Sequence, residues 1–380
     1  MSKVSLLACD RYEISLLKEK LGESVDNLGG WEPYIAKGER VLLKVNLVSN
    51  KEPDIAATTH PLFVQALCEL LQEYGAQVMI GDSPGGLFNE EILRRLYKGT
   101  GMQEAAEASG AALNWNTDAI EVKNPQGKLL KQLTQTAMLQ DVDKVISVSK
   151  LKTHGMMVFT GAVKNQFGTV PGTKKAEYHF RMPKTEDFAD ALIDICLAAS
   201  PVLCFMDGIM AMEGNGPTGG TPRKIGAVLA SANPFELDMI ASSLIGLKRE
   251  QVFTLQQAYL RGLGPESEKD VEVVGEGPMH FKVTDFQMPD HIKPELMSKF
   301  GSVGIALSRV LRPKVRFHKD ICVGCRMCYN HCPAKAITMK DRFPTVNYSE
   351  CIRCYCCQEL CPKNAITVHE SWIMKLANKL

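Results

Sequence analysis

The sequence lacks a long apolar run, a secretory leader and a run of basic residues interleaved with aromatic ones. Its longest obvious apolar stretches, such as residues 195–206, have the length of a buried strand or helix and are too short to cross a bilayer. Near the amino terminus, Asp10 places a charge within a short apolar stretch, and no signal-peptide core or twin-arginine pair is present. We therefore expect a cytoplasmic protein without a transmembrane segment.

Signs of nucleic-acid or nucleotide binding are also missing. The formal net charge is +1, and we expect no nucleic-acid partner. A phosphate-binding GxxxxGK[ST] loop is absent, because Gly168 and Gly172 are too close together and Thr173 stands where the lysine should follow. Residues 214–219 match GxGxxG by letter, but the residues after them predict a strand, not the helix that would hold a pyrophosphate.

Cysteine is abundant, and nine of the 13 cysteines lie in the last 60 residues. Eight of these form two runs with the spacing Cys-x2-Cys-x2-Cys-x3-Cys-Pro. This spacing is typical of a ferredoxin module with two 4Fe-4S clusters, because three thiolates wrap one cluster and the fourth reaches the other. We expect one cluster to be held by Cys322, Cys325, Cys328 and Cys361, and the other by Cys351, Cys354, Cys357 and Cys332.

Zinc sites and redox pairs use similar spacings, but neither explains a run of four that occurs twice. The runs form a repeat of 29 residues whose β-branched flanks, 336–339 and 365–368, predict short strands. Cys356 occupies the position of Met327 in the first run, so we interpret it as a small apolar residue against the cluster and not as a ligand. Thiol ligands of this kind indicate a reducing compartment and an oxygen-poor, anaerobic host.

Residues 1–290 have the pattern of one α/β domain. A strand at 41–48, a helix at 61–74 and a strand at 77–80 form a predicted βαβ unit, which implies a parallel sheet. We also predict strands at 144–148, 202–206 and 225–230, helices at 188–199 and 235–245, and a turn at 124–127. The expected fold class is therefore α/β with a mainly parallel sheet, followed by a small α+β ferredoxin-like domain with two clusters at 313–369.

Two amphipathic helices are predicted outside these domains. Apolar residues recur at helical spacing in 291–312, a predicted linker helix, and in 370–380, a predicted C-terminal helix with Ser371 as its N-cap. Docking of the ferredoxin domain is the commoner use of such helices, and contact with a membrane surface or a partner is the alternative.

Polar side chains gather where the predicted strands end, which is where an α/β sheet places its ligand. Lys44 and Asn46 lie two residues apart on one predicted strand and therefore share a face. Each loop that follows a predicted strand, taken singly, has the composition of a plain turn. Together they favour a pocket for a small anionic substrate.

We assign roles to these residues by their chemistry. The predicted catalytic residues are Lys152, His154, Lys164 and His179, with the lysines as charge partners and the histidines as acid or base. The predicted binding residues are Lys44, Asn46, Asp82, Asn165, Asp207, Glu213 and Asn215. A further metal held by His154, His179, Asp82 or Asp207 has no supporting ligand spacing.

Five separated motifs resemble one family. They are AATTHP (56–61), IGDSPGG (80–86), KLKTH (150–154), GAVKNQFG (161–168) and DGIMAMEGNGP (207–217), and they are similar to domain of unknown function 362. Members of that family often carry a carboxy-terminal ferredoxin module. The resemblance implies that these loops belong together, but it implies no particular reaction. For the ferredoxin part, it implies ligand roles for the eight repeated cysteines.

The sequence thus predicts a protein that binds two 4Fe-4S clusters and transfers single electrons. The first hypothesis is a redox enzyme that passes electrons from a donor such as a ferredoxin or flavodoxin to a substrate in the α/β domain, where tethering raises the effective donor concentration. The second is a non-catalytic adaptor that docks a partner protein. The third is a maturation factor whose clusters are structural.

The ferredoxin region is basic, with ten Lys or Arg against four Asp or Glu in residues 312–369, a net charge of +6. This charge could offset the negative clusters or steer an acidic electron donor, and we predict the latter. Reduction by an acidic ferredoxin should therefore slow as salt rises, because salt screens the attraction. Stopped-flow reduction at several ionic strengths measures this, and a rate independent of salt would contradict it.

Overall fold

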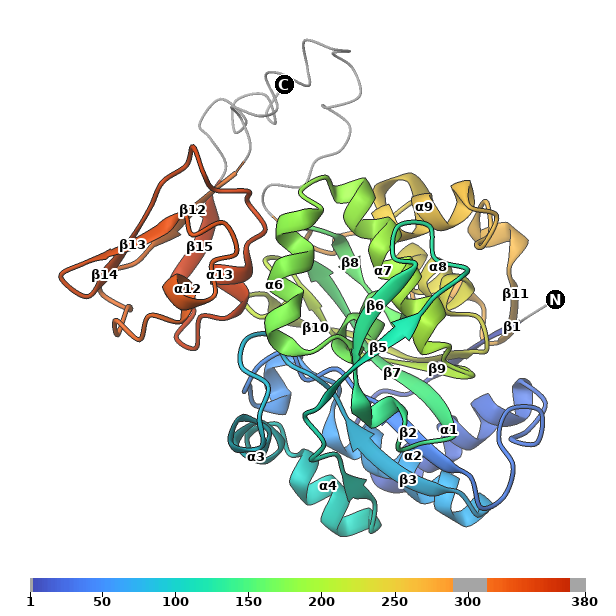
Figure 1. Ribbon diagram of the computed structural model, residues 1–380. Helices are drawn as coiled ribbons and strands as arrows, with labels where there is room; N and C mark the ends of the chain where they lie inside the picture. Colours follow the sequence, from blue (N-terminus) through green and yellow to red (C-terminus); the bar gives the residue numbers. More distant parts are fainter. Residues whose placement is uncertain (1–2, 290–312, 370–380) are drawn as a thin grey trace.

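The computed structural model describes residues 3–289 and 313–369 (Figure 1). These residues form a large domain around a mixed, mostly parallel sheet and a small domain with short antiparallel strands. The predicted fold class is therefore confirmed for both parts. The helices predicted at 291–312 and 370–380, with the cap at Ser371, lie outside the described residues, and the domain boundaries stay predictions.

Strands and helices alternate over most of the large domain. Its strands are β1 (Lys3–Ala8), β2 (Arg40–Lys44), β3 (Gln77–Gly81), β4 (Ala112–Leu113), β5 (Ala119–Lys123), β6 (Gln132–Thr136), β7 (Lys144–His154), β8 (Val158–Thr160), β9 (Leu203–Glu213), β10 (Thr221–Ser231) and β11 (Glu272–Gly275). Its α-helices are α1 (Ile14–Asn27), α2 (Pro61–Tyr74), α3 (Glu90–Gly99), α4 (Met102–Ser109), α5 (Ala162–Asn165), α6 (Gly172–Arg181), α7 (Thr185–Ala199), α8 (Pro234–Leu244) and α9 (Phe253–Leu260).

The sheet brings the ends of β2, β3 and β7 together. Among the described residues it has nine strands in the order β11-β1-β10-β9-β7-β2-β3-β4, with β8 paired to the end of β7. The strands from β9 to β4 are mutually parallel, whereas β10 runs antiparallel to β9 and β1. The chain leaves β2 towards β3 and later returns to β7 on the other side of β2. In an open sheet, this switch point is where a crevice forms at the carboxyl ends of the strands.

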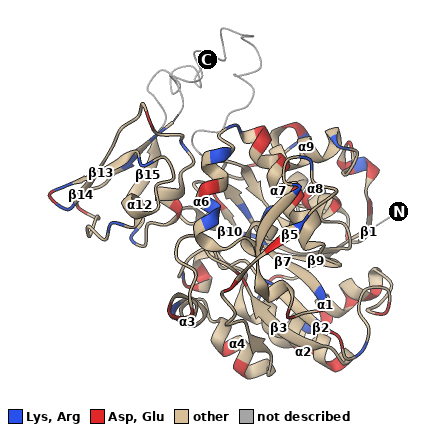
Figure 2. Cartoon of the chain, viewed as in Figure 1, with Lys and Arg blue, Asp and Glu red and all other residues tan. Residues whose placement is uncertain are grey.

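Helices cover both faces of this sheet. Val41 and Leu43 of β2 pack with α1, α2, α3 and α4 on one face, and Leu229 of β10 packs with α8 and α9 on the other. Because both faces are buried, the central strands are apolar almost throughout, as is usual for parallel sheets. Charged residues of both signs are distributed along the elements of the large domain (Figure 2).

Several local predictions agree with the structure. Helix α2 begins and ends where its pattern predicts. The turn at 124–127 joins β5 to β6. The GxGxxG segment is followed by β10, as expected for a segment that is not a dinucleotide loop.

Three strand ends differ from the prediction. The strand expected at 41–48 ends at Lys44, so Asn46 does not share a strand face with it. The strands expected at 144–148 and 202–206 continue to His154 and Glu213. In β7 the apolar pattern stops before the strand does, because the later part of the strand buries the polar residues Lys150 and Lys152. A hydrophobicity pattern cannot anticipate the partners that make this burial possible.

The small domain repeats its secondary structure as well as its cysteines. It consists of β12 (Lys314–Phe317), α12 (Met327–Asn330), β13 (Ile337–Lys340), β14 (Phe343–Val346), α13 (Cys356–Glu359) and β15 (Ile366–His369). Each of the last three elements lies 29 residues after its counterpart. The strands predicted at 336–339 and 365–368 are confirmed as β13 and β15, which pair with β14 and β12.

Asp194 of α7 fixes the segment between β5 and β6, and its loss should destabilise the large domain. Its buried carboxylate accepts the N–H groups of Lys128, Leu129 and Leu130 at 2.7–2.8 Å and pairs with Arg261 at 2.7 Å. Asp194→Ala leaves these donors unpaired, at a cost of about 3–5 kcal/mol. We expect anaerobic thermal unfolding, followed by circular dichroism, to occur roughly 5 °C or more lower.

The exposed Glu186, also on α7, provides the control for this change. Glu186→Ala should cost less than about 1 kcal/mol, because only a weak helix-dipole interaction is lost. Equal unfolding temperatures for the two variants would contradict the structural role of Asp194.

Candidate functional site

The eight repeated cysteines divide between two cavities of the small domain. The outer cavity is lined by Cys322, Cys325, Cys328 and Cys361. The inner cavity is lined by Cys332, Cys351, Cys354 and Cys357. Each cavity takes three cysteines from one run and the last cysteine of the other run, so it gathers one of the two sets that the spacing predicts. The ligand roles themselves stay predictions.

The lining of both cavities fits a 4Fe-4S cluster. Apart from the cysteines, the lining side chains of both cavities are largely apolar, such as Ile366 in the outer cavity and Ile337 in the inner one. The Ala365 N–H donates to Cys361 Sγ at 3.2 Å, the type of bond that tunes a cluster's potential. Four thiols per cavity are the donors that this cofactor requires, and a cluster bound there would supply one-electron transfer.

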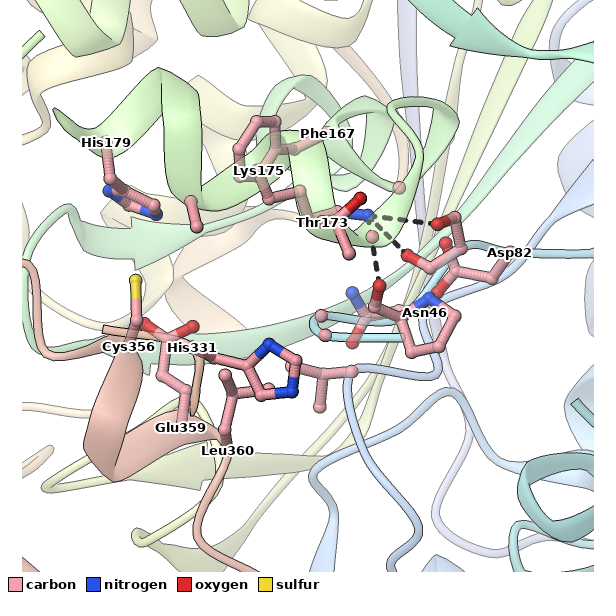
Figure 3. Close-up of a pocket in the computed structure, with 18 of the residues that line it drawn as sticks. Asn46, Asp82, Phe167, Thr173, Lys175, His179, His331, Cys356, Glu359 and Leu360 are labelled. Carbon is pink, nitrogen blue, oxygen red and sulfur yellow. Dashed lines mark hydrogen bonds between the residues drawn. The ribbon is translucent and has the colours of Figure 1, made fainter. Parts of the chain in front are cut away.

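A pocket of about 790 Å³, partly open to solvent, lies between the two domains (Figure 3). The large domain contributes the ends of β2 and β3 and residues between 164 and 179. The small domain contributes His331, Cys356, Glu359 and Leu360.

Most of the predicted site residues gather at this pocket. The residues that line it are Lys44, Asn46, Asp82, Lys164, Asn165 and His179. Lys152 and His154 lie behind the wall: Lys152 Nζ donates to Asn46 Oδ1 at 2.6 Å, and His154 Nε2 lies 3.1 Å from Glu359 Oε1. The carboxyl ends of β2, β3 and β7 thus converge on one site.

A buried network forms the floor of the pocket. Lys44 Nζ pairs with Asp82 Oδ1 at 2.8 Å and donates to Asn165 Oδ1 at 3.0 Å. Burial lowers the pKa of Lys44, and the attraction of Asp82 opposes that shift. Asn46 Nδ2 joins the network through Asn165 at 3.3 Å although it lies beyond the end of β2. A Cβ at Gly168 would collide with both members of the ion pair, so only glycine fits there.

Two nitrogen atoms in the pocket have no hydrogen-bond partner among the described residues. Lys164 Nζ lies 5.9 Å from the centre of the Phe167 ring, and no hydrogen bond to it is formed within residues 3–289 and 313–369. His179 is 5% exposed, and its Nδ1 is likewise unpaired in the described part of the chain. Because an unsatisfied buried polar atom is costly, a ligand that pairs with His179 Nδ1 would be stabilised, and the partly buried Lys164 could also contact it. Burial lowers the pKa of His179 to about 3, so the imidazole is neutral near pH 7.

Lys175 is a pocket residue that the sequence analysis missed. Its Nζ donates to the Ser83 and Val170 carbonyls at 2.7 Å and to the Pro84 carbonyl at 3.3 Å, which ties the 82–86 loop to α6. Burial lowers its pKa to about 7. Its position four residues before His179 could have placed both on one helix face, but α6 itself was not predicted.

His154 and Glu359 form a contact between the domains. The Met156 and Met157 N–H groups donate to His154 Nδ1 at 3.0 and 3.2 Å, so this nitrogen is unprotonated and Nε2 carries the proton that faces Glu359. Burial lowers the pKa of His154 to about 4. Burial raises the pKa of Glu359, but attraction from His154, Lys164 and His179 outweighs it and lowers that pKa to about 2. A neutral imidazole therefore lies in contact with a carboxylate.

Three predicted binding residues do not line the pocket. Asp207 accepts hydrogen bonds from Tyr12 Oη at 2.8 Å and Lys150 Nζ at 2.7 Å, in a separate buried network. Glu213 accepts the Gln287 N–H at 3.0 Å. Asn215 lies in the turn before the cis Gly216–Pro217 bond. Strand β9 runs beside β7 to its end, with Met212 opposite Lys152, so these residues lie along β7 and away from the pocket lining. Their binding role stays a prediction.

Cys356 has a neighbourhood that its spacing did not indicate. It is buried beside Cys354, and it lines the pocket between the domains, whereas the inner cavity is lined by its neighbours in sequence. Apart from the two cysteine cavities, no group of three or more His, Cys, Asp or Glu in the described ranges could hold a metal ion, so a further metal at His154, His179, Asp82 or Asp207 has no geometric support. None of the helices in residues 3–289 and 313–369 is both long and apolar enough to cross a membrane.

Known proteins similar to this chain define its family. A solved structure, the lactate racemase apoprotein from Thermoanaerobacterium thermosaccharolyticum, has a TM-score of 0.37 and 10% identity over 62% of this chain and 55% of that chain, which is too distant to support an argument. A thylakoid-associated protein of Synechocystis sp. is 31% identical over 332 residues, 84% of this chain and 97% of that protein. Residues 314–362 match the 4Fe-4S dicluster domain, and residues 41–243 match domain of unknown function DUF362. The chain therefore belongs to the DUF362 family and carries a 4Fe-4S ferredoxin-like domain.

Proposed function

We propose that the protein is a redox enzyme that reduces a small anionic substrate held between its two domains. In this proposal, residues 1–290 bind the substrate, and residues 313–369 carry electrons through two 4Fe-4S clusters. One cluster is held by Cys322, Cys325, Cys328 and Cys361, and the other by Cys332, Cys351, Cys354 and Cys357. The donor is an acidic ferredoxin or flavodoxin in an oxygen-poor cytoplasm. Each electron that the donor loses is gained by the substrate, and solvent supplies any proton.

The observation that carries this proposal is the position of helix α13. Its Cys357 lines the inner cavity, whereas Cys356 and Glu359 of the same four-residue helix line the pocket. A substrate in the pocket would therefore lie one short helix away from the thiols of the inner cavity. A carrier that only docked a partner, or a factor with structural clusters, would not require such a pocket on this helix.

The pocket residues divide into those that bind and those that position. Lys164 offers an unpaired ammonium group to an anion, and the neutral His179 offers Nδ1 as a hydrogen-bond acceptor or donor, according to its tautomer. Lys44, Asp82 and Asn165 form the rigid floor. Lys152 acts through Asn46, whose amide oxygen it holds at 2.6 Å. Lys152 and His154, predicted as catalytic, are thus positioning residues in this proposal.

The proposal is tested by anion binding to full-length, cluster-replete protein under anaerobic conditions. The probes are inorganic phosphate, sulfate and a panel of mono- and dicarboxylates, with affinity measured by thermal shift and calorimetry. Lys164→Met removes the charge and keeps the volume, and the loss of one charge-assisted hydrogen bond should weaken binding about 10- to 100-fold.

Lys174→Met provides the matched control, because Lys174 is exposed and pairs with Glu177 on α6. It should bind as the unchanged protein does, and both variants should keep the cluster absorption spectrum. Equal effects of the two changes, or no anion bound by the unchanged protein, would count against an anion pocket and favour the adaptor hypothesis.

Anion affinity should also depend on pH through Lys175. Its pKa of about 7, lowered by burial, means that the pocket loses positive charge as pH rises through 7. Burial keeps the pKa values of His154 and His179 at about 4 and about 3, so they stay neutral from pH 6 to 8. We therefore expect affinity for sulfate, whose own charge is constant in this range, to fall from pH 6 to pH 8.

Calorimetry on two variants of Lys175 separates this cause from others. Lys175→Arg keeps a charge that does not titrate in this range, and Lys175→Met has none, so both should bind sulfate with a flatter pH dependence. An unchanged pH slope in both variants would assign the dependence to another group.

A further inference from the structure

The two halves of the small domain have the same elements but different surroundings. In α13, Cys356 and Gln358 are buried and Glu359 contacts His154 of the large domain. The counterpart of Gln358 in α12 is Tyr329, which is 46% exposed. The counterpart of Cys354 is Cys325, which is exposed. The second repeat is therefore the one that the large domain covers more fully, whereas the first repeat, apart from His331 at the pocket, is more open.

Large apolar side chains lie exposed on the open repeat. Ile321 is 43% exposed and Val323 is 52% exposed, and these two residues flank Cys322 in sequence. Val323, Cys325 and Arg326 also line the outer cavity together. With Ile321 and Tyr329, which are exposed on the same nine-residue segment, they make up what we call the outer face. Exposed apolar side chains gathered next to a functional group mark a contact surface. The matching positions of the second repeat, Glu350 and Ile352, are a charged residue and a partly buried one.

The positive charge of the small domain is concentrated in the same repeat. Residues 314–342 hold seven Lys or Arg and two Asp or Glu, a net charge of +5, and all nine side chains are exposed. Residues 343–369 hold two of each sign, a net charge of zero. Figure 2 shows blue segments along the part of the small domain that points away from the large domain. The outer face is thus an apolar patch in a basic setting.

We infer that the outer face is the docking site for a small redox protein whose own redox centre is surrounded by acidic residues. The inference rests on the proposed function and adds the direction of electron transfer. Electrons pass from the docked donor to the cluster site of the outer cavity, then to that of the inner cavity, and from there to the pocket. In each encounter the reduced donor loses one electron and the small domain gains it. Apolar contact beside a redox centre with a charged surround gives rapid, weak association, as electron transfer requires.

The docking site is tested by binding, which does not depend on turnover. The probe is a purified acidic plant-type 2Fe-2S ferredoxin, titrated by calorimetry into full-length, cluster-replete protein at low and moderate salt. Tyr329→Glu places a charge on the outer face, and it should raise Kd at least tenfold. Arg326→Asn removes a charge at a positive φ of 64°, which asparagine tolerates, and it should weaken binding and reduce the salt dependence.

Lys314→Glu is the control for charge, because it lowers the net charge by two, more than Tyr329→Glu or Arg326→Asn does, on an exposed residue of β12 beside Tyr348. It should raise Kd less than threefold at moderate salt. Equal weakening by Tyr329→Glu and Lys314→Glu would overturn a specific face and leave only general attraction. Absence of binding by the unchanged protein, or self-association that Tyr329→Glu abolishes in sedimentation, would overturn an acidic donor as the occupant.

Failure of this inference can be told apart from failure of the proposed function. Tyr329→Glu should leave anion affinity in the pocket unchanged, and Lys164→Met should leave the Kd for the donor unchanged. Loss of anion binding in both variants would overturn the separation of the two sites. If the docking face behaves as expected but no ligand binds in the pocket, the enzyme hypothesis would be overturned and the hypothesis of a non-catalytic electron carrier would be favoured.

Discussion

Two adjacent cysteines on one short helix constrain the whole arrangement. Successive residues of an α-helix point about 100° apart, so Cys356 and Cys357 face different chambers. One lines the pocket and the other lines the inner cavity. The contact between Glu359 and His154 then fixes this helix against the end of β7. The distance between the substrate pocket and the predicted cluster site is therefore set by one turn of helix and not by the orientation of two independent bodies.

Two of the lysine side chains that the large domain buries each need a partner of opposite charge. The side chains of Lys44 and Lys150 are fully buried, and each is neutralised by a partner, Asp82 or Asp207. Replacing such pairs by apolar residues is often neutral or stabilising, while breaking one costs about 3–5 kcal/mol. The Lys44–Asp82 pair instead positions its neighbours. Lys44 exchanges two hydrogen bonds with Asn165, and Asp82, at the start of the 82–86 loop, accepts the Leu47 N–H.

The sequence predicted what depends on local chemistry and missed what depends on distant contacts. The cysteine runs were recognisable because cluster ligation imposes a spacing on neighbouring residues. The central strands were recognisable because both faces are buried. The end of β7 was not, because a register shift between Lys150 and Lys152 sends these lysines into different polar networks. Glu359 could not be paired with His154 from the sequence, since the two lie 205 residues apart.

The pocket has one wall from each domain, and this shared construction makes ligand binding and domain docking thermodynamically linked. A molecule that contacts both Lys164 and the α13 side binds more tightly when the domains are docked, and by reciprocity it strengthens the docking by the same factor. The His154–Glu359 contact contributes to the same balance from within the chain. Occupancy of the pocket would in this way favour the docked arrangement of the two domains, and an empty pocket would leave them more easily separated.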